Sequence, residues 1–500
     1  MADYILGLDA GNTVIKAIIF DLAGNELAVA AEDGQSTMPQ PGHVERDLDE
    51  LWVNTQQVIR RCVEAAGIDA ADIRAIGCAG HGNGLYALDR AGAPLIGIQS
   101  IDTRGSQTVR EWQAEGVGEK TFPLCRQKPW AAQTPTLLAW LKQHRPDLFA
   151  EIGTVFLCKD YVVWRLTGTR VSETSDMAGC GLLQVPERTY SADLMAAYGL
   201  DDCLPLLPAL LEPTDIAGHI SADVAAATGL RAGTLVVAGL FDVVASAIGS
   251  GVTQTGAASI IAGTWSINQV VTDEAPDDPS IFMLCTFDRQ RWLAIESSAT
   301  SAVNLEWMVR EFFGEDHGAA FERCSALVAS VDPRDEMPIY HPFLFGAQQD
   351  GQARAGYYGI LGWHTKAHML RALFEGVAFE HRRHIETLAS AGAGFTEAVL
   401  SGGGSRSSVW PQIFADLLGV PVTVARGRET GALGAAIAAG TGIGLFADFT
   451  EGAARMTAVA KRFEPSPALK PVYDRRYATF LELGRAMKPI WANMAKDNAA

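Results

Sequence analysis

The first residues with a chemical signature are Asp9-Ala10-Gly11-Asn12-Thr13, a turn of small residues that carries a carboxylate. The turn joins two apolar stretches, residues 4–8 and 14–20, which predict a hairpin of two buried strands. The backbone N–H groups of such a turn can surround a phosphate while the aspartate faces a metal ion. Most Asp-x-Gly turns only reverse the chain, so this pattern needs support from elsewhere in the sequence.

Asp242 stands where a predicted strand becomes a helix. Residues 235–239 are apolar or small, and residues 243–248 then show apolar positions at helical spacing. A carboxylate at such a junction lies at the mouth of an α/β crevice, which is where these folds place their chemistry. An aspartate that only caps the helix N-terminus fits the same position equally well.

Two more glycine-containing turns occur in the second half of the chain. Gly263-Thr264 joins predicted strands at residues 256–262 and 265–271. The glycines of residues 401–405 lie between a predicted strand, residues 398–400, and a predicted helix, residues 409–418. Glycines before a helix let the backbone approach a ligand closely at the helix N-terminus.

The elements around these turns repeat. The N-terminal hairpin continues into a third strand, residues 26–31, and a helix opened by Asp47 leads to a strand at residues 73–79. A second hairpin with a phosphate-type turn begins half a chain later, at residue 256. Two similar halves predict a duplicated α/β domain around a central cleft. The helix between two strands predicts a mixed sheet with helices packed on it.

A long helix predicted for residues 367–388 carries His381 and His384. Their spacing resembles that of a metal-binding pair, but no third ligand stands nearby in the sequence. Two structural histidines in the core are therefore favoured.

Composition restricts the partners and the compartment. The formal charge of −18 argues against a nucleic-acid or anionic-membrane partner, because both need clustered Lys and Arg. The cysteines are scattered with no CxxC pair, and no signal peptide or apolar run of membrane-spanning length is found, so we expect a cytoplasmic protein. The sequence also lacks GxxxxGK(S/T), GxGxxG after the first strand, GxSxG and HExxH, which disfavours P-loop, Rossmann, α/β-hydrolase and zinc-protease chemistry.

Taken in order, these pieces resemble the FGGY family of carbohydrate kinases from Leu6 to about Tyr477. The matching motifs are LGLDAGNTVIKA (6–17), PGHVERDLDELW (41–52), FLCKDYVVWRLTG (156–168), AGLFDVVASAIGSG (238–251), AGTWS (262–266) and SGGGSRSSVWPQIFADLLGVPV (401–422). The resemblance implies an α/β fold of two actin-like ATPase (ribonuclease H-like) domains with a central cleft, of the sugar kinase, Hsp70 and actin type. It divides the chain into an N-terminal domain on the sugar side, residues 1–246, and a C-terminal domain on the nucleotide side, residues 247–490.

The resemblance also implies roles for individual residues, with ATP and Mg²⁺ as cofactors. Asp242 matches the family's catalytic base, and Asp9 matches the aspartate that helps to hold Mg²⁺, here through water. The first turn approaches the phosphates, the second contacts the transferring phosphate, and the glycine loop lies near the adenosine end. The implied nucleotide-binding residues are Asp9, Gly11, Asn12, Thr13, Lys16, Gly263, Thr264, Gly402, Gly403 and Ser407.

Within the family, the chain most resembles the L-xylulose (3-dehydro-L-gulonate) kinase branch, through PQPGHVERD, GLFDVV, AGTW and EGVAFEHRRH. It lacks the residue pairs with which glycerol kinases contact glycerol, and the Met-His pair that D-xylulose kinases favour at Gly82-Asn83. His81 replaces a glutamine common in the branch. Besides Asp242, each candidate sugar contact is equally compatible with a structural role. The candidates are His81, Gly82, Asn83, Glu45, Arg46, Asp102 and Asp242.

The expected function is transfer of the γ-phosphate of ATP to a terminal hydroxyl of a ketose, L-xylulose or a related ketopentose or ketogulonate, with Asp242 as base. A kinase for an erythritol-like or glycerol-like polyol is the alternative within the class. An actin- or Hsp70-like nucleotide switch without a sugar substrate is the alternative outside it, and it predicts no base at position 242. Dimers are common among relatives, which leaves a homodimer open.

Overall fold

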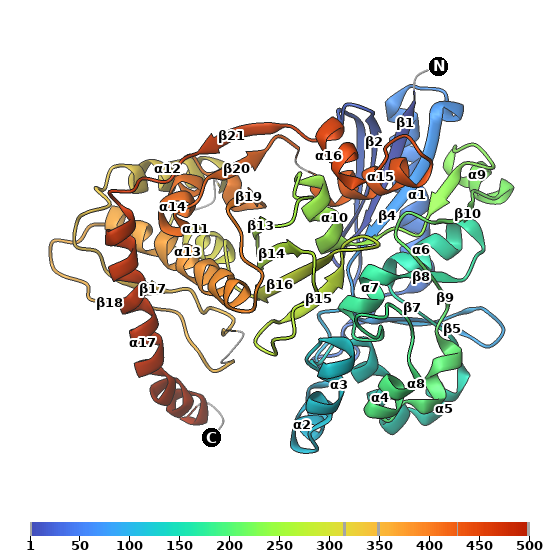
Figure 1. Cartoon of the computed structure of the whole chain (residues 1–500), viewed down its shortest axis with the longest axis horizontal. Helices are drawn as coiled ribbons and strands as arrows, with labels where there is room; N and C mark the ends of the chain where they lie inside the picture. Colours follow the sequence, from blue (N-terminus) through green and yellow to red (C-terminus); the bar gives the residue numbers. More distant parts are fainter. Residues whose placement is uncertain (1–2, 314–316, 348–350, 428, 498–500) are drawn as a thin grey trace. The chain divides into compact units, whose positions relative to one another are not determined.

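A computed structural model describes residues 3–313, 317–347, 351–427 and 429–497. The chain forms two units (Figure 1). Unit 1 comprises Met1–Gln254, Val271–Ala294 and Glu429–Ala458, and unit 2 comprises Thr255–Val270, Ile295–Arg428 and Val459–Ala500. The sequence predicts one domain boundary, between residues 246 and 247, whereas each unit of the structure combines three stretches of the chain. That boundary stays a prediction. In the described part of the chain, no helix is long and apolar enough to cross a membrane.

The central sheet of unit 1 has the strand order β10-β11-β4-β1-β2-β3, and β12 also pairs with β4. Its strands are β1 (Tyr4–Ala10), β2 (Val14–Asp21), β3 (Glu26–Asp33), β4 (Ile73–Gly80), β10 (Ile216–His219), β11 (Leu235–Val237) and β12 (Leu240–Phe241). As expected, β1 and β2 form an antiparallel hairpin, and β4 lies parallel to β1 after helix α1 (Leu48–Ala66). Of the strand predicted at residues 235–239, β11 covers residues 235–237, and the second short strand, β12, begins just after the predicted range.

The two faces of β1 have different neighbours because successive side chains point to opposite sides. Leu6 and Leu8 join a core with residues of α1 and of α6 (Cys158–Thr167). Gly7 faces helix α15 (Thr430–Gly442), where a Cβ on this glycine would lie 2.1 Å from the carbonyl oxygen of Ala432. The small-residue helix therefore packs on the sheet at backbone distance, which brings late residues beside the first strands (Figure 1).

The rest of unit 1 consists of two small sheets and short helices. One sheet has the order β6-β5-β7, and the other pairs β8 with β9. Their strands are β5 (Leu85–Asp89), β6 (Pro94–Ile98), β7 (Ile152–Phe156), β8 (Val171–Glu173) and β9 (Ala209–Leu211). Strand β15 (Met283–Thr286) also lies in this unit but belongs to neither small sheet. The helices are α2 (Ser106–Ala114), α3 (Val117–Cys125), α4 (Thr134–His144), α5 (Pro146–Glu151), α7 (Thr174–Gly179), α8 (Ala192–Tyr198), α9 (Ala222–Thr228), α10 (Asp242–Gly249) and α16 (Phe449–Met456), with short 3₁₀ turns η1 (Ala70–Asp72) and η2 (Asp201–Leu206).

Unit 2 is built around a sheet in which β16, β14, β13, β19, β20 and β21 follow one another. These strands are β13 (Ala257–Ala262), β14 (Ser266–Thr272), β16 (Trp292–Ser298), β19 (Glu397–Ser401), β20 (Val422–Ala425) and β21 (Val459–Phe463). A separate hairpin pairs β17 (Ile339–His341) with β18 (Gly356–Tyr358). The helices are α11 (Val303–Phe312), α12 (His317–Ala329), α13 (Lys366–Ser390), α14 (Trp410–Leu418) and α17 (Lys470–Asp497), with the 3₁₀ turn η3 (Gly403–Arg406).

The two central sheets repeat one topology, as the sequence pattern predicts. In unit 1, β1 pairs antiparallel with β2 and parallel with β4. In unit 2, β13 pairs antiparallel with β14 and parallel with β19. In each unit the hairpin turn therefore follows the strand, β1 or β13, that pairs antiparallel with one neighbour and parallel with the other.

Candidate active site

Asp242 is the first residue of helix α10, directly after strand β12. Phe241 occupies the N-cap position, and no side-chain hydrogen bond caps the helix. The alternative interpretation of Asp242 as the N-cap is therefore wrong, because β12 pairs with β4 up to Phe241 and the helix starts at Asp242 itself, one residue earlier than a cap at this position requires. The backbone N–H of Phe241 donates to Ser175 Oγ at 3.1 Å and fixes the entry into the helix.

Asp9 lies on the same face of β1 as Gly7 and points at the N-terminus of α15. A Cβ built on Gly431 would lie 2.6 Å from Asp9 Oδ2, so the glycine leaves the room that the carboxylate occupies. Burial raises the pKa of Asp9 to about 6, while Lys16 opposes and Glu429 adds to this shift. Lys16, the register partner of Asp9 across the hairpin, pairs with Glu429 at 2.6 Å.

The structure brings Asp9 and Asp242 into electrostatic contact within unit 1. Burial, and then the charge of Asp9, raise the pKa of Asp242 well above its ordinary value. A bound cation relieves the unfavourable ionisation of such carboxylates, and a carboxylate with a raised pKa can accept a proton. The two aspartates therefore suit a site that binds a cation and accepts a proton.

The first turn is held by its carbonyl groups. Arg46 Nη1 donates to the carbonyl of Gly11 at 3.0 Å, and Gln99 Nε2 donates to that of Asn12 at 2.8 Å. The backbone N–H groups of Asn12 and Thr13 have no partner among the described residues. The turn therefore presents donors while its acceptors are occupied, which suits an anionic ligand.

The loop that follows β4 carries three predicted sugar contacts. His81 is buried and its Nε2 lies 2.8 Å from the hydroxyl of Tyr86, while burial lowers its pKa to about 3, so the ring stays neutral. Gly82 faces Phe241 and Asp176, and a Cβ there would lie 2.7 Å from Asp176 Oδ1. Asn83 has a φ of +61°, and its buried Oδ1 has no hydrogen-bond partner among the described residues. Asn83 is thus the member of this loop with an unused polar atom.

The other predicted sugar contacts are engaged with the protein. Asp102 accepts from the N–H of Val44 at 2.6 Å and pairs with Arg104 at 2.9 Å. Glu45 pairs with the same arginine at 2.8 Å. Arg46 supports the first turn, although its buried Nε and Nη2 make no hydrogen bond with a described residue. Sugar binding by these three residues stays a prediction.

A buried charge cluster behind this loop was missed by sequence reasoning. Lys159 pairs with Asp160 at 2.5 Å, and with Glu173 and Asp176 at 3.2 Å each. Glu173 in turn accepts from Ser175, the residue that receives the N–H of Phe241. Lys159 and Asp160 stand at the start of an otherwise apolar helix, and this charged pair was the available signal.

In unit 2, the second turn and the glycine loop lie against each other. Gly402 has a φ of +78°, and a Cβ there would lie 2.9 Å from the backbone of Ala262 and 3.1 Å from Gly263 N. Thr264 is exposed. The structure thus brings the predicted residues Gly263, Thr264, Gly402 and Gly403 into one region.

A pocket of about 730 Å³ adjoins the glycine loop. Ser407 lines it, shares a hydrogen bond with Ser325 Oγ at 3.0 Å, and accepts from the N–H of Trp410 at 3.2 Å. Aromatic and charged side chains share the lining. It includes Leu305, Glu306, Phe321, Glu322, Gly403, Arg406, Ser407 and Trp410. A pocket with an apolar side, a few polar groups and a glycine backbone can hold a nucleoside.

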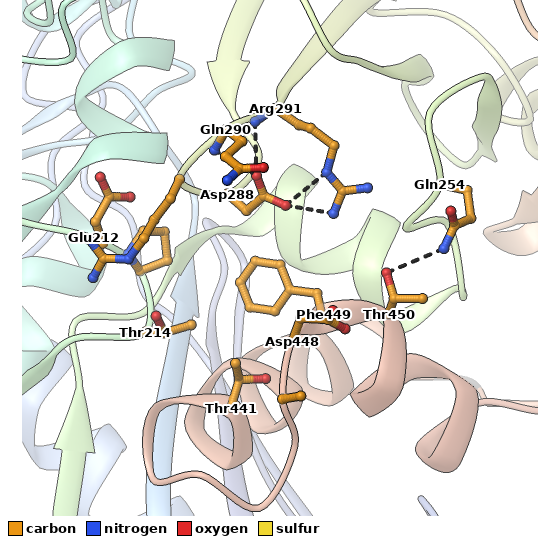
Figure 2. Close-up of a pocket in the computed structure, with 13 residues that line it drawn as sticks. Glu212, Thr214, Gln254, Asp288, Gln290, Arg291, Thr441, Asp448, Phe449 and Thr450 are labelled. Carbon is orange, nitrogen blue, oxygen red and sulfur yellow. Dashed lines mark hydrogen bonds and ion pairs between the residues drawn. The ribbon is translucent and has the colours of Figure 1, made fainter.

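A second pocket, of about 570 Å³, lies in unit 1 between residues 288–291, residues 212–214 and α16 (Figure 2). None of the predicted site residues lines it. Two pairs of its polar side chains bond to each other, Arg291 with Asp288 and Gln254 with Thr450.

Two family models cover most of the chain. The N-terminal domain of the FGGY family of carbohydrate kinases matches residues 4–249, and its C-terminal domain matches residues 258–443. The L-xylulose/3-keto-L-gulonate kinase of Escherichia coli (strain K12) is 34% identical over 498 residues, which cover 99% of this chain and 99% of that protein. A probable L-xylulose kinase of Pasteurella multocida (strain Pm70) is 33% identical and covers 98% of this chain and 100% of that protein.

A solved structure agrees with these matches. The crystal structure of xylulose kinase from Rhodospirillum rubrum superposes with a TM-score of 0.90 at 29% identity, over 98% of this chain and 100% of that chain.

Proposed function

The chain belongs to the FGGY family of carbohydrate kinases and is an ATP-dependent sugar kinase, and on this premise we propose that it phosphorylates a terminal hydroxyl of a ketose. The proposed ketose is L-xylulose or a related ketopentose or ketogulonate, with Asp242 as base. The sugar class is supported by the names of the relatives, which are L-xylulose kinases. They favour neither the polyol kinase nor the nucleotide switch.

The observation that carries the proposal is Asp242 at the start of α10, beside the charge of Asp9. Asp242 accepts a hydrogen bond from the sugar hydroxyl, holds its oxygen in line with the γ-phosphate, and takes the proton onto a carboxylate oxygen as the new O–P bond forms. Its raised pKa makes it a stronger proton acceptor than an exposed aspartate. The helix N-terminus helps to keep it ionised.

The residues around Asp9 fit a magnesium ion that arrives with the nucleotide. Mg²⁺ is bound in such enzymes by one or two carboxylates together with phosphates and waters. Among the described residues, no group of three or more His, Cys, Asp and Glu side chains could hold a metal by itself, so an all-protein cage is not what this site offers. We assign Asp9 to hold the ion through water, and the ion when bound supplies neutralisation of the phosphate charge.

The phosphates are assigned to the two turns. In unit 1, the free N–H groups of Asn12 and Thr13 bind phosphate oxygens, with Lys16 as a nearby cation. In unit 2, Gly263 and Thr264 contact the transferring phosphate, and the pocket beside Gly403 and Ser407 receives the nucleoside. In this proposal the phosphates are bound mainly by backbone N–H donors and by few cationic side chains. This mode of binding is consistent with the formal charge of −18.

We also place the enzyme in the cytoplasm, which the free, buried state of all eight cysteines supports. A homodimer stays an expectation from the family.

The decisive experiment replaces Asp242 by Asn, which keeps the volume but accepts no proton. We expect Asp242→Asn to retain binding of ATP and sugar by calorimetry, while kcat in a coupled ADP-release assay falls roughly 10²- to 10⁴-fold. Asp215→Asn, which removes a carboxylate paired with Arg289 elsewhere in unit 1, is the matched control and should retain kcat. A near-normal kcat for Asp242→Asn would remove this residue from the chemistry.

A further inference from the structure

A buried polar network in unit 2 connects helix α13 to the Gly263-Thr264 turn. The ring of His381, on α13, contacts two serines that flank the turn in space. Its Nδ1 lies 3.2 Å from the Oγ of Ser266, and its Nε2 lies 2.9 Å from the Oγ of Ser301. His381 and both serines are 0% exposed. A single imidazole thus joins two separate chain segments.

Both segments are attached to the turn through the backbone. The N–H of Ala302, directly after Ser301, donates to the carbonyl of Gly263 at 2.8 Å. Ser266 begins β14 directly after Trp265, whose carbonyl accepts from the N–H of Gly263 at 3.2 Å. The imidazole therefore supports the turn from both of its sides.

The direction of the hydrogen bonds can be derived from Glu380. Burial raises the pKa of this carboxyl, but the neighbouring Arg383 and His384 outweigh it and lower the pKa to about 2. His384 Nε2 lies 3.3 Å from Glu380 Oε1, which is close enough for an ion-pair contact but lacks hydrogen-bond geometry. A proton on Nε2 faces this negative charge, and it leaves Nδ1 of His384 as an acceptor.

The same logic continues to the serine. His384 Nδ1 lies 3.0 Å from Asn268 Nδ2, so the amide donates there and turns its Oδ1 toward His381 Nδ1, 2.8 Å away. His381 then donates from Nδ1 and accepts at Nε2 from the hydroxyl of Ser301. The donors and acceptors of this network therefore all run in one direction, from the hydroxyl of Ser301 toward Glu380. This direction requires the tautomer of His381 that carries its proton on Nδ1.

We propose that His381 is a positioning residue for phosphoryl transfer, which holds Ser301 directly and Ser266 through the amide of Asn268, and through them the Gly263-Thr264 turn in the geometry that binds the transferring phosphate. The inference rests on the proposed function, in which this turn contacts that phosphate. Alignment of the reacting groups dominates phosphoryl transfer, so a small displacement of the turn is costly. The network also confirms the prediction that His381 and His384 are structural histidines.

The first test removes one hydroxyl. Ser301→Ala deletes the donor to His381 and changes little volume. We expect kcat to fall roughly 10- to 100-fold, with the KM for the sugar within about twofold of wild type. Ser259→Ala is the matched control: its serine is also 0% exposed, in β13, and its Oγ has no partner among the described residues. Equal kcat values for the two alanine variants would overturn the inference.

The second test uses rescue at the histidine. His381→Leu removes both ring contacts, whereas a glutamine can reach the Nε2 position with its carbonyl and accept from Ser301. We expect His381→Leu to lose kcat like Ser301→Ala and His381→Gln to recover most of it, at equal unfolding temperatures. Equal kcat values for His381→Leu and His381→Gln would contradict the inference. If His381→Leu fails to fold, the result for Ser301→Ala decides whether the inference holds.

Thr264→Ala separates this inference from the function on which it rests. A slow Thr264→Ala variant with a normal Ser301→Ala variant overturns the positioning role and leaves the phosphate role of the turn intact. A normal Thr264→Ala variant removes the phosphate role, and the positioning inference falls with it.

Discussion

Asp9 and Asp242 are carboxylates held where their own ionisation is unfavourable. Burial is the largest cause of the raised pKa of both residues, and the negative charge of Asp9 raises the pKa of Asp242 further. A buried carboxylate is normally neutralised or paired, so two carboxylates with raised pKa values in one unit indicate a site for a ligand of opposite charge. At the residue scale, the two aspartates therefore suit the binding of a cation and the acceptance of a proton.

The raised pKa values predict the pH dependence of the enzyme. A base works only when it is ionised, so kcat/KM, which reports the free enzyme, should fall as the pH is lowered through about 6, the pKa of Asp9, and through the raised pKa of Asp242. A bound cation favours ionised Asp9, so kcat should fall only at lower pH. Steady-state kinetics between pH 5 and 8 checks this, and a flat kcat/KM down to pH 5 contradicts it.

Asp102 and Asn83 are expected to respond differently to substitution. Asp102→Asn leaves Arg104 buried with a weakened partner, so urea unfolding should show a loss of about 3 kcal/mol while the KM for the sugar changes little. Asn83→Ala removes a buried oxygen that has no protein partner among the described residues and should raise the sugar KM roughly tenfold. The opposite result would make Asp102 the sugar contact.

At the scale of elements, helix α15 organises the site of unit 1. Its residue Gly431 faces the carboxylate of Asp9, and its residue Gly434 lies against α10, the helix that begins with Asp242. The close approach needs glycine at both positions: a Cβ on Gly434 would lie 1.9 Å from the carbonyl oxygen of Ala245. One helix therefore sets the positions of both carboxylates.

The two glycines of α15 predict two different phenotypes. Gly431→Ala adds a methyl group against the end of the Asp9 side chain, so it should lower kcat and raise the Mg²⁺ requirement roughly tenfold with little loss of stability. Gly434→Ala adds a methyl group against the backbone of Ala245, which cannot move aside easily, and this should destabilise the protein by about 1–3 kcal/mol. Thermal unfolding and Mg²⁺ titrations of kcat distinguish them, and identical behaviour of the two variants would contradict the assignment.

At the scale of the whole molecule, two sheets of one topology are assigned different tasks. The hairpin turn of unit 1 lies beside the carboxylates, and that of unit 2 lies beside the glycine loop and its pocket. The relatives confirm the predicted fold of two actin-like domains.

The relatives predict the outcome of a substrate panel. With ATP and Mg²⁺, L-xylulose or a ketogulonate should give a kcat/KM roughly 100-fold above that for glycerol or erythritol, because a site that pairs with a carbonyl and its hydroxyls rejects alditols that lack the carbonyl. ADP release measures this, and Asp242→Asn serves as the blank. Highest activity on an alditol would replace the ketose proposal.

The sequence by itself determined the elements and the order of the chemical groups. Period-two and helical patterns located β1, β2, β4, α13 and α14 to within a few residues, since local burial dictates them. Asp9, Gly263-Thr264 and the glycine loop could be identified because each is a short local pattern of small residues in a turn between predicted elements. The family resemblance, carried by motif order, supplied the roles proposed for them.

Only the tertiary structure decided which groups are neighbours. Lys16 pairs with Glu429 across 413 residues of sequence, and Asp9 meets Gly431 over a similar distance. The same holds for Lys159 with Asp176, Glu45 with Arg104, and His381 with Ser301, where charge or polarity alone does not identify the partner. The physical reason is that burial makes polar groups find partners, and the chain path through the core, which no local pattern encodes, decides which partners are within reach.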